Sequence, residues 1–188
     1  MKNAIILHGT CGREEYFSDT YPSLSNSHWF PWLQKQLLIN GIFTQTPEMP
    51  DAYKPDYKKW RSEFERFHID KDSILIGHSC GGGFLVRWLT ENKIPIKKLV
   101  LVAPWLDPER RKTDIFFDFT IDPTITERTH VHILVSNDDD KDIQDSVHTI
   151  QEKMPKLNRH NFQNMGHFCY NDMKTKEFPA LLDIILKE

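Results

Sequence analysis

The sequence is poor in cysteine, and it has no long apolar segment and no block of basic residues. Its three cysteines, Cys11, Cys80 and Cys169, are an odd number without the spacing of a metal site, so they do not make a disulfide framework. A small buried thiol is the expected state of such residues, and a redox role is left open for all three. We therefore expect a protein of the reducing cytoplasm.

The absence of long apolar and basic stretches also restricts the partners of the chain. The apolar run within residues 1–9 is too short for a signal peptide, and no segment approaches the length of a membrane span. The formal charge is −3, from 24 basic and 27 acidic residues, whereas phosphate recognition requires clustered lysine and arginine. We expect a cytoplasmic protein with no membrane or nucleic-acid partner. A protein partner is left open, although no segment indicates one.

Short apolar runs alternate with helical patterns along the whole chain. Its 188 residues are enough for one domain, residues 1–188, and too few for two. Continuous apolar runs fit strands buried on both faces, and short β-helix-β units require parallel strands with right-handed crossovers. The prediction is a three-layer α/β/α sandwich with about six parallel strands and no large cap domain. The predicted strands are residues 4–7, 42–46, 73–77, 98–103, 131–135 and 159–163.

Helices are predicted between these runs from the spacing of their apolar residues. Residues 57–67 carry aromatic side chains at i, i+3, i+7 and i+10, a pattern that indicates an amphipathic helix with an aromatic face in the core. Residues 13–27 are expected to be irregular, and residues 107–129 irregular or partly helical. The other predicted helices are residues 28–40, 80–92, 143–154 and 178–186.

Ser79 lies in a Gly-x-Ser-x-Gly segment between a predicted strand and a predicted helix. This layout is typical of a nucleophile elbow, a sharp strand-to-helix turn that exposes one serine. Side chains at Gly77 and Gly81 are expected to collide with the neighbouring strand and helix, which gives both glycines a physical reason. Ser79 is therefore the candidate nucleophile. Cys80 occupies the wrong position to replace it, and its side chain is expected to point into the core.

A serine hydroxyl needs a base within hydrogen-bond reach, and that base needs a carboxylate to orient it. His167, in the loop after the last predicted strand, is the best candidate for the base. The loop after the fifth predicted strand offers three adjacent carboxylates. Counting from the end of that strand in a small-x-x-Asp turn favours Asp139, with Asp138 and Asp140 left as alternatives. The chain order is then Ser79, Asp139, His167.

Acyl transfer also requires donors for an oxyanion and a pocket for the acyl group. The backbone N–H of Cys80 can supply one donor at the start of the elbow helix, where the helix dipole also favours negative charge. The second donor is expected from Thr10, in the glycine loop after the first strand. Trp105, at the end of its strand, and Phe84 are candidates for lining the acyl pocket, although core packing accounts for Phe84 at least as well.

His130 and His132 alternate on one face of a predicted strand and, with the acidic loop nearby, raise the question of a metal site. Liganding requires a third converging group with the right geometry, and half-buried strand histidines are far commoner. We therefore expect no metal, and the chemistry outlined above requires no cofactor.

Three segments resemble the small serine hydrolases of the retinoblastoma-binding protein 9 family, a group of α/β-hydrolases. They are the elbow at residues 77–82, the His-Trp-Phe-Pro-Trp element at 28–32 with the Pro-Glu-Met-Pro segment at 47–50, and Gly-His-Phe at 166–168. The resemblance implies a six-stranded minimal hydrolase core without a large lid, and Ser79, Asp139 and His167 as the triad. Family members often place proline after the acid, whereas Asp140 follows Asp139 here.

Together these features predict a serine hydrolase that cleaves small esters, thioesters or amides through an acyl-enzyme intermediate. The lack of lid sequence favours a small or open pocket and speaks against bulky triglycerides. The alternative is a non-catalytic protein of the same fold that acts as a protein-interaction module. The sequence does not distinguish ester from amide substrates, because both reactions use the same triad.

Overall fold

The computed structural model describes residues 2–110, 112–113 and 115–187. Strands in this part of the chain form one sheet, in the order β2-β1-β3-β4-β5-β6, and every neighbouring pair is parallel. The predicted strands and their direction are confirmed, each within one residue at either end. They are β1 (Asn3–Leu7), β2 (Phe43–Gln45), β3 (Ile74–His78), β4 (Lys98–Val102), β5 (His130–Ser136) and β6 (Asn158–Phe162).

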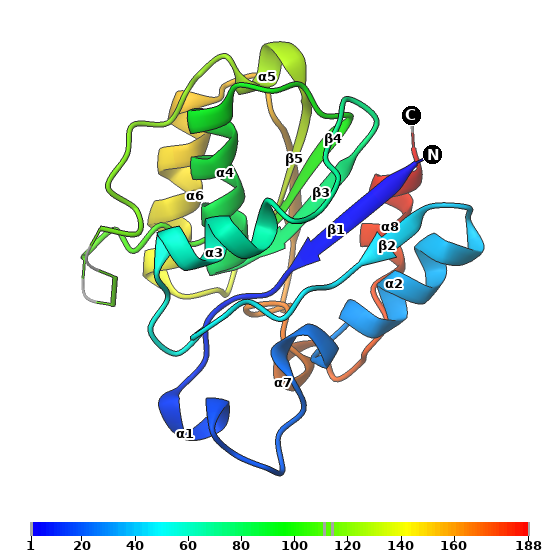
Figure 1. Ribbon diagram of the computed structural model, residues 1–188, viewed down its shortest axis with the longest axis vertical. Helices are drawn as coiled ribbons and strands as arrows, with labels where there is room; N and C mark the ends of the chain where they lie inside the picture. The colour runs from blue at the N-terminus through cyan, green and yellow to red at the C-terminus, as the bar shows by residue number, and fades with distance from the viewer. Residues whose placement is uncertain (1, 111, 114, 188) are drawn as a thin grey trace.

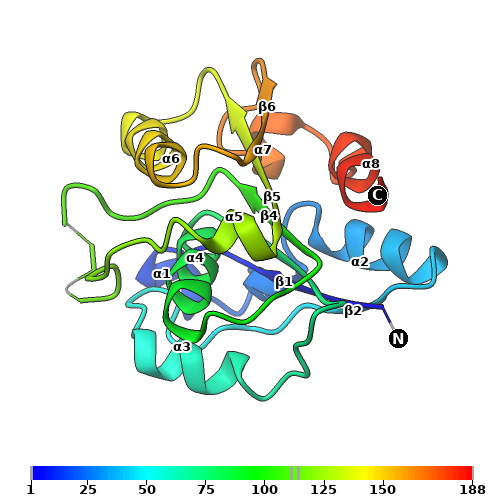
Figure 2. The ribbon, with the colours of Figure 1, turned by 90° about the horizontal axis from the view of Figure 1, so that it is seen from above.

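Helices cover both faces of this sheet, which gives the predicted three layers (Figures 1 and 2). One face carries α2 (Phe30–Ile39) and α8 (Pro179–Leu186), and the other carries α3 (Tyr57–Phe64), α4 (Cys80–Asn92) and α6 (Lys141–Lys153). The shorter helical elements are α1 (Arg13–Tyr16), a 3-10 turn (Leu24–Asn26), α5 (Ile125–Arg128) and α7 (Tyr170–Met173). No helix in the described ranges is long and apolar enough to cross a membrane.

The sequence of each strand matches its position in the sheet. The inner strands β1, β3 and β4 are buried along their whole length because helices cover both of their faces. The edge strand β6 is polar and mostly exposed, and the other edge strand, β2, is only three residues long. Short or polar edges of this kind discourage pairing with other chains.

The connections between strands reverse direction between β1 and β3. From β1 the chain passes through α2 to β2 on one side, and it then returns through α3 to β3 on the other side of β1. Ligands of parallel α/β sheets bind at such a reversal, outside the carboxyl ends of the strands. The glycine loop after β1 and Ser79 after β3 both lie at this end of the sheet.

The predicted aromatic face of residues 57–67 packs into the core as far as Phe64, where α3 ends, whereas Phe67 lies beyond the helix and is only partly buried. Trp60 and Phe64 on α3 both contact Phe84 on α4, with ring centroids 5.8 and 5.4 Å apart, and all three rings are fully buried. Rings in such edge-to-face contacts contribute about 0.5–1.5 kcal/mol per pair beyond their burial. This cluster therefore fixes α3 and α4 against each other.

Candidate active site

Ser79 occupies a strained turn between β3 and α4. Its backbone angles, φ 54° and ψ −125°, are rare for a residue with a side chain, and a tight strand-to-helix turn imposes them. The turn is held by hydrogen bonds to its neighbours. The Ser79 N–H donates to the Val102 carbonyl at 3.0 Å, and the Ser79 carbonyl accepts from the N–H groups of Gly82 and Trp105 at 2.9 and 3.0 Å. The predicted elbow is therefore present, and the end of β4 braces it.

Close backbone approaches explain three glycines around Ser79. A Cβ atom at Gly77 would lie 2.6 Å from the backbone of α4, and one at Gly81 would lie 2.5 Å from the carbonyl oxygen of His8. A Cβ atom at Gly9 would lie 2.8 Å from the Cβ of Ser79 itself. The expected collisions at Gly77 and Gly81 are thus confirmed, and Gly9 allows the loop after β1 to pass directly over the serine.

Replacing Gly81 by alanine is expected to destabilise the fold by at least about 2 kcal/mol, because the new methyl group would meet backbone atoms of β1 that cannot move aside cheaply. Gly12→Ala is the matched control, since nothing lies within 4 Å of a Cβ there. It should change the free energy of unfolding by no more than about 0.5 kcal/mol. Urea denaturation of both variants measures the difference, and equal losses would contradict the packing argument.

His167 and Asp139 come from different loops and meet at this edge of the sheet. The Nδ1 atom of His167 lies 3.0 and 3.1 Å from the two carboxylate oxygens of Asp139. The Asp139 side chain is only 2% exposed, whereas that of His167 is 30% exposed. A buried carboxylate against Nδ1 fixes the ring so that its other nitrogen, Nε2, is left to act as a base.

His167 shares a cavity of about 210 Å³ with Ser79. Ser79 enters it from the elbow, Thr10 from the loop after β1 and His167 from the loop after β6. The structure therefore brings together residues that are far apart in the sequence, at the carboxyl ends of three strands. The lining residues are Thr10, Ser79, Trp105, Lys112, Asp140, Asp142, Ile143 and His167.

The other two carboxylates of the acidic loop have different contacts. Asp138 accepts hydrogen bonds from the Ser136 hydroxyl and from the Gly166 N–H, the latter at 3.1 Å. The bond from Ser136 is the main reason why the pKa of Asp138 lies below its usual range. Asp140 is the exposed residue that precedes α6. Of the three carboxylates, Asp139 is the one that the structure places against His167.

Asp172 is a residue that the sequence reasoning missed. Its carboxylate accepts the N–H of His167 at 3.0 Å and that of Cys169 at 3.3 Å, so it fixes the backbone on which the imidazole is carried. It also lies against Gly166, where a Cβ would come within 2.5 Å of Asp172 Cγ and where φ is +50°. No sequence motif marks a carboxylate five residues after a histidine.

The two expected oxyanion donors belong to different elements, Cys80 to the start of α4 and Thr10 to the loop after β1. Cys80 is the first residue of α4, and N–H groups in the first turn of a helix have no partner within the helix. Its side chain is fully buried, as expected, and burial raises the pKa of the thiol well above its usual value. Thr10 lines the cavity from the loop after β1.

The other two cysteines also have thiols of low reactivity. Burial is the main cause that raises the pKa of Cys11 to about 11 and that of Cys169 to about 12. Thiolate is the reactive form, so little of it forms at neutral pH. Cys11, Cys80 and Cys169 are all free of disulfides.

The two candidate pocket residues have different environments. Trp105 lines the cavity, and its indole N–H donates to the Asp142 carboxylate at 2.9 Å. The ammonium of Lys112 lies 5.4 Å from the centroid of the Trp105 ring. Phe84 belongs to the buried aromatic cluster of α3 and α4, and it is not among the residues that line the cavity. Its placement favours core packing, the alternative considered for it.

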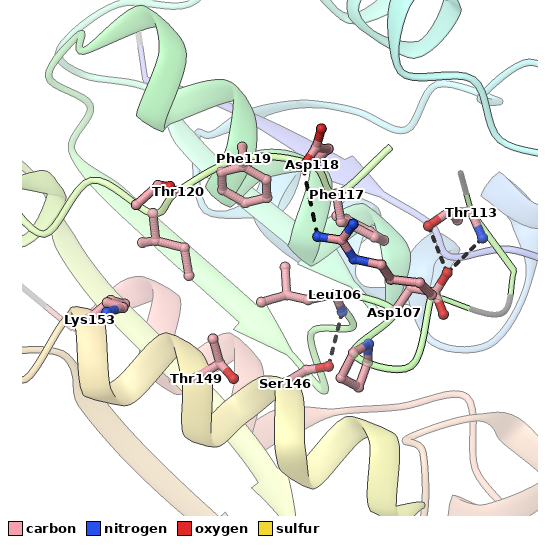
Figure 3. A pocket seen from close by; sticks show the side chains of 13 residues that line it. Leu106, Asp107, Thr113, Phe117, Asp118, Phe119, Thr120, Ser146, Thr149 and Lys153 are labelled. Carbon is pink, nitrogen blue, oxygen red and sulfur yellow. Dashed lines mark hydrogen bonds and ion pairs between the residues drawn. The ribbon is translucent and has the colours of Figure 1, made fainter. Parts of the chain in front are cut away.

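A second and larger cavity, of about 420 Å³, lies beside α6 and away from Ser79 (Figure 3). One wall is the segment after β4, which is fastened to α6 by the hydrogen bond from the Leu106 N–H to the Ser146 hydroxyl at 3.0 Å. In the same segment Asp107 accepts the Thr113 N–H and hydroxyl. The cavity shares no lining residue with the one that contains Ser79 and His167.

Of the two strand histidines that suggested a metal site, His130 is exposed and His132 pairs with His160 across β5 and β6. His132 Nδ1 lies 3.0 Å from His160 Nε2, and the two rings are stacked. In the described ranges, no group of three histidine, cysteine, aspartate or glutamate side chains could hold a metal ion. Burial, with Lys98 nearby, lowers the pKa of His132 to about 4. His132 is therefore neutral at pH 7.

Acidification is expected to destabilise the wild type more than a His132→Phe variant. In the unfolded chain the histidine takes up a proton below about pH 6.5, whereas folded His132 takes it up only near pH 4. The free energy of unfolding therefore falls as the pH is lowered from 6.5 to 4. Between pH 7 and pH 5 the variant should lose about 1 kcal/mol less than the wild type, after allowance for solvent screening of the half-exposed ring. Urea titrations at both pH values measure this. His148→Gln, at an exposed histidine, is the matched control.

Known proteins resemble this chain along its whole length. A family model described as serine hydrolase matches residues 19–182. YdeN of Bacillus subtilis (strain 168), which carries the name of a hydrolase, is 23% identical over 191 residues, covering 98% of this chain and 94% of YdeN. The crystal structure of the B. subtilis ydeN gene product has a TM-score of 0.81 at 22% identity, covering 98% of this chain and 97% of that one.

More distant structures have the same fold. A YdeN-like hydrolase from Pectobacterium atrosepticum SCRI1043 has a TM-score of 0.64 at 16% identity, covering 98% of this chain and 89% of that one. Est1E from Butyrivibrio proteoclasticus has a TM-score of 0.63 at 16% identity, covering 98% and 88%. With the parallel sheet and the absence of a large cap in the described ranges, these likenesses show an α/β-hydrolase fold.

Proposed function

The chain belongs to the serine hydrolase family, and we propose that it cleaves small esters, thioesters or amides through a covalent acyl-enzyme intermediate. One observation carries the proposal. His167, held at Nδ1 by the buried carboxylate of Asp139, opens into the same small cavity as the strained Ser79. A nucleophile, a base and a group that orients the base are the parts required for acyl transfer.

In the proposed reaction, the hydroxyl oxygen of Ser79 attacks the substrate carbonyl while Nε2 of His167 takes the hydroxyl proton. Asp139 keeps the proton on Nδ1 and stabilises the imidazolium that forms. The N–H groups of Cys80 and Thr10 donate hydrogen bonds to the oxyanion of the tetrahedral intermediate and stabilise its negative charge. His167 then protonates the leaving alcohol, thiol or amine. Water, activated by the same imidazole, attacks the acyl-serine and releases the acid.

The size of the cavity supports a small substrate. A volume of about 210 Å³ is below the range of about 300–1,000 Å³ typical of drug-sized ligands. The polar side chains of Lys112, Asp140 and Asp142 at its walls suit polar groups better than long acyl chains. Est1E, a protein of the same fold, has been crystallised with ferulic acid bound, a carboxylic acid of the kind that an ester hydrolase releases.

Within the serine hydrolases, we propose that the nearest group is the retinoblastoma-binding protein 9 family and that the protein works in the cytoplasm. The His-Trp-Phe-Pro-Trp element supports the first proposal, and the sparse cysteines with raised pKa values are compatible with the second. A role as a non-catalytic interaction module is the competing function. It predicts a folded protein whose Ser79 does not react with acylating agents.

Labelling with a fluorophosphonate probe distinguishes enzyme from interaction module, because the probe reacts with an activated serine. We expect rapid labelling of the wild type, with the adduct mapped to Ser79 by peptide mass spectrometry, and no labelling of Ser79→Ala. Circular dichroism of both proteins shows that they are folded. A folded wild type that stays unlabelled would refute the proposed hydrolase and favour the interaction module.

A further inference from the structure

His78, the residue before Ser79, lies beneath the loop that carries His167. Its Nε2 atom is 2.7 Å from the backbone carbonyl oxygen of His167, and the centroids of the two imidazole rings are 4.8 Å apart. His78 is the last residue of β3, and its ring packs against Phe30, the first residue of α2. Of the two adjacent elbow residues, His78 therefore contacts the backbone of His167, and Ser79 lines the cavity.

The hydrogen bond fixes the protonation state of His78. A carbonyl oxygen can only accept, so Nε2 must carry the proton and donate it. The ring is 3% exposed and surrounded by aromatic side chains, with the Trp29 and Phe30 rings at 6.0 and 5.9 Å. Burial, together with the nearby His167, holds the pKa of His78 well below its usual value. His78 is thus a neutral donor at neutral pH.

Neighbouring side chains hold the next parts of the same loop. The indole N–H of Trp29 donates to the Phe168 carbonyl at 3.1 Å, and Nδ1 of His28 accepts the Tyr170 N–H at 3.1 Å. On the opposite side, the Asp172 carboxylate accepts the His167 N–H. The histidine loop is therefore fastened by side chains on both sides, and His78 is the contact that joins it to the elbow.

We propose that His78 is a positioning residue, whose Nε2–H fixes the backbone of His167 and thereby the distance between the imidazole and the Ser79 hydroxyl. The inference rests on the proposed hydrolase function. His78 and Ser79 are consecutive residues of one rigid turn. The hydrogen bond from His78 therefore fixes the position of His167 relative to Ser79. A displacement of about 1 Å at a reacting group can lower the rate about 100-fold. Loss of the hydrogen bond from His78 to His167 is therefore expected to slow the reaction.

Two substitutions separate the hydrogen bond from packing. His78→Phe keeps a buried ring and removes the donor, whereas His78→Gln replaces the ring by a side-chain amide that can donate from a similar position. We expect His78→Phe to lower kcat for p-nitrophenyl acetate about 10- to 100-fold with KM changed less than about twofold. His78→Gln should recover most of that loss. Phe30→Leu, which alters a ring against His78 but no hydrogen bond of the loop, is the packing control.

A second measurement does not depend on activity. Nitrogen-15 NMR of the wild-type histidines at pH 7 should show a neutral imidazole with its proton on Nε2, and this signal should be missing in both His78→Phe and His78→Gln. A proton on Nδ1 of His78 would overturn the inference even if neither variant folds. So would a folded His78→Phe enzyme with wild-type kcat, or a Phe30→Leu enzyme with an equal loss.

The outcomes separate this inference from the proposed function. A wild type that fluorophosphonate does not label refutes the hydrolase, and with it any positioning role in catalysis. A labelled wild type whose His78→Phe variant keeps its kcat refutes the positioning role alone. A labelled wild type with reduced kcat in His78→Phe, recovery in His78→Gln and the Nε2–H signal supports both.

Discussion

Replacing His167 by alanine is expected to lower kcat for p-nitrophenyl acetate by about 10⁴-fold or more, with the protein still folded. The substitution removes the imidazole that we propose takes the proton from Ser79, and no other histidine lines the cavity within the described ranges. A serine hydroxyl without a base is a weak nucleophile at neutral pH. Steady-state assays of purified wild type and variant measure the loss, and fluorophosphonate labelling should slow in parallel.

The loss of activity must be separated from a loss of stability. Without His167 the carboxylate of Asp139, 2% exposed, has lost its imidazole partner, and we expect this to cost about 1–3 kcal/mol of folding free energy. Urea denaturation gives this value independently of the assay. His148→Ala, at an exposed histidine on α6, is the matched control and should keep wild-type kcat. A folded His167→Ala enzyme with more than about a tenth of wild-type kcat would contradict its role as the base.

The fold was predictable because the inner strands of a parallel sheet require apolar side chains on both faces. Strands such as β1 and β4 are covered on both faces, so they appear in the sequence as short continuous apolar runs. The elbow was also predictable from the sequence, because Gly77 and Gly81 must lack side chains where β3, α4 and the end of β1 approach each other. Both features depend on local sequence and general packing rules.

The parts of the site that sequence left undecided depend on contacts between distant loops. Which carboxylate of residues 138–140 reaches the imidazole is decided by how the loops after β5 and β6 meet. Asp138 is turned toward the Gly166 N–H and Asp139 toward His167. The role of Asp172 and the bond from His78 to the histidine loop have the same origin. No periodicity or motif encodes such side-chain to backbone bonds.

Phe84 shows the opposite case, in which a residue close to the elbow in sequence lies away from the cavity. It stands five residues after Ser79, more than one turn along α4, and that helix leads away from the carboxyl edge of the sheet. Its ring is therefore available to the core, where α3 supplies Trp60 and Phe64. Thr10 and Trp105, which are remote in sequence, reach the cavity because they follow the ends of β1 and β4.

The second large effect is expected for Asp139→Asn, which should lower kcat by about 10⁴-fold with little change in the fold. Asparagine has nearly the same shape, but its amide is neutral and can donate to Nδ1 of His167, so it favours the wrong tautomer and does not stabilise imidazolium. The side chain is buried against the ring, so water cannot take over these roles easily. Assays with p-nitrophenyl acetate and histidine NMR of the variant measure the rate and the tautomer.

The neighbouring carboxylates make this test specific. Asp138→Asn keeps a carbonyl oxygen that can accept from Ser136 and Gly166, so we expect kcat to change less than about threefold. Asp140→Asn, at the exposed start of α6, should change it less than about tenfold. All three substitutions remove one negative charge from the same loop, so a general electrostatic effect would lower the three rates alike. A selective loss at Asp139 requires direct contact with His167, and a selective loss at Asp138 or Asp140 would assign the acid to that residue instead.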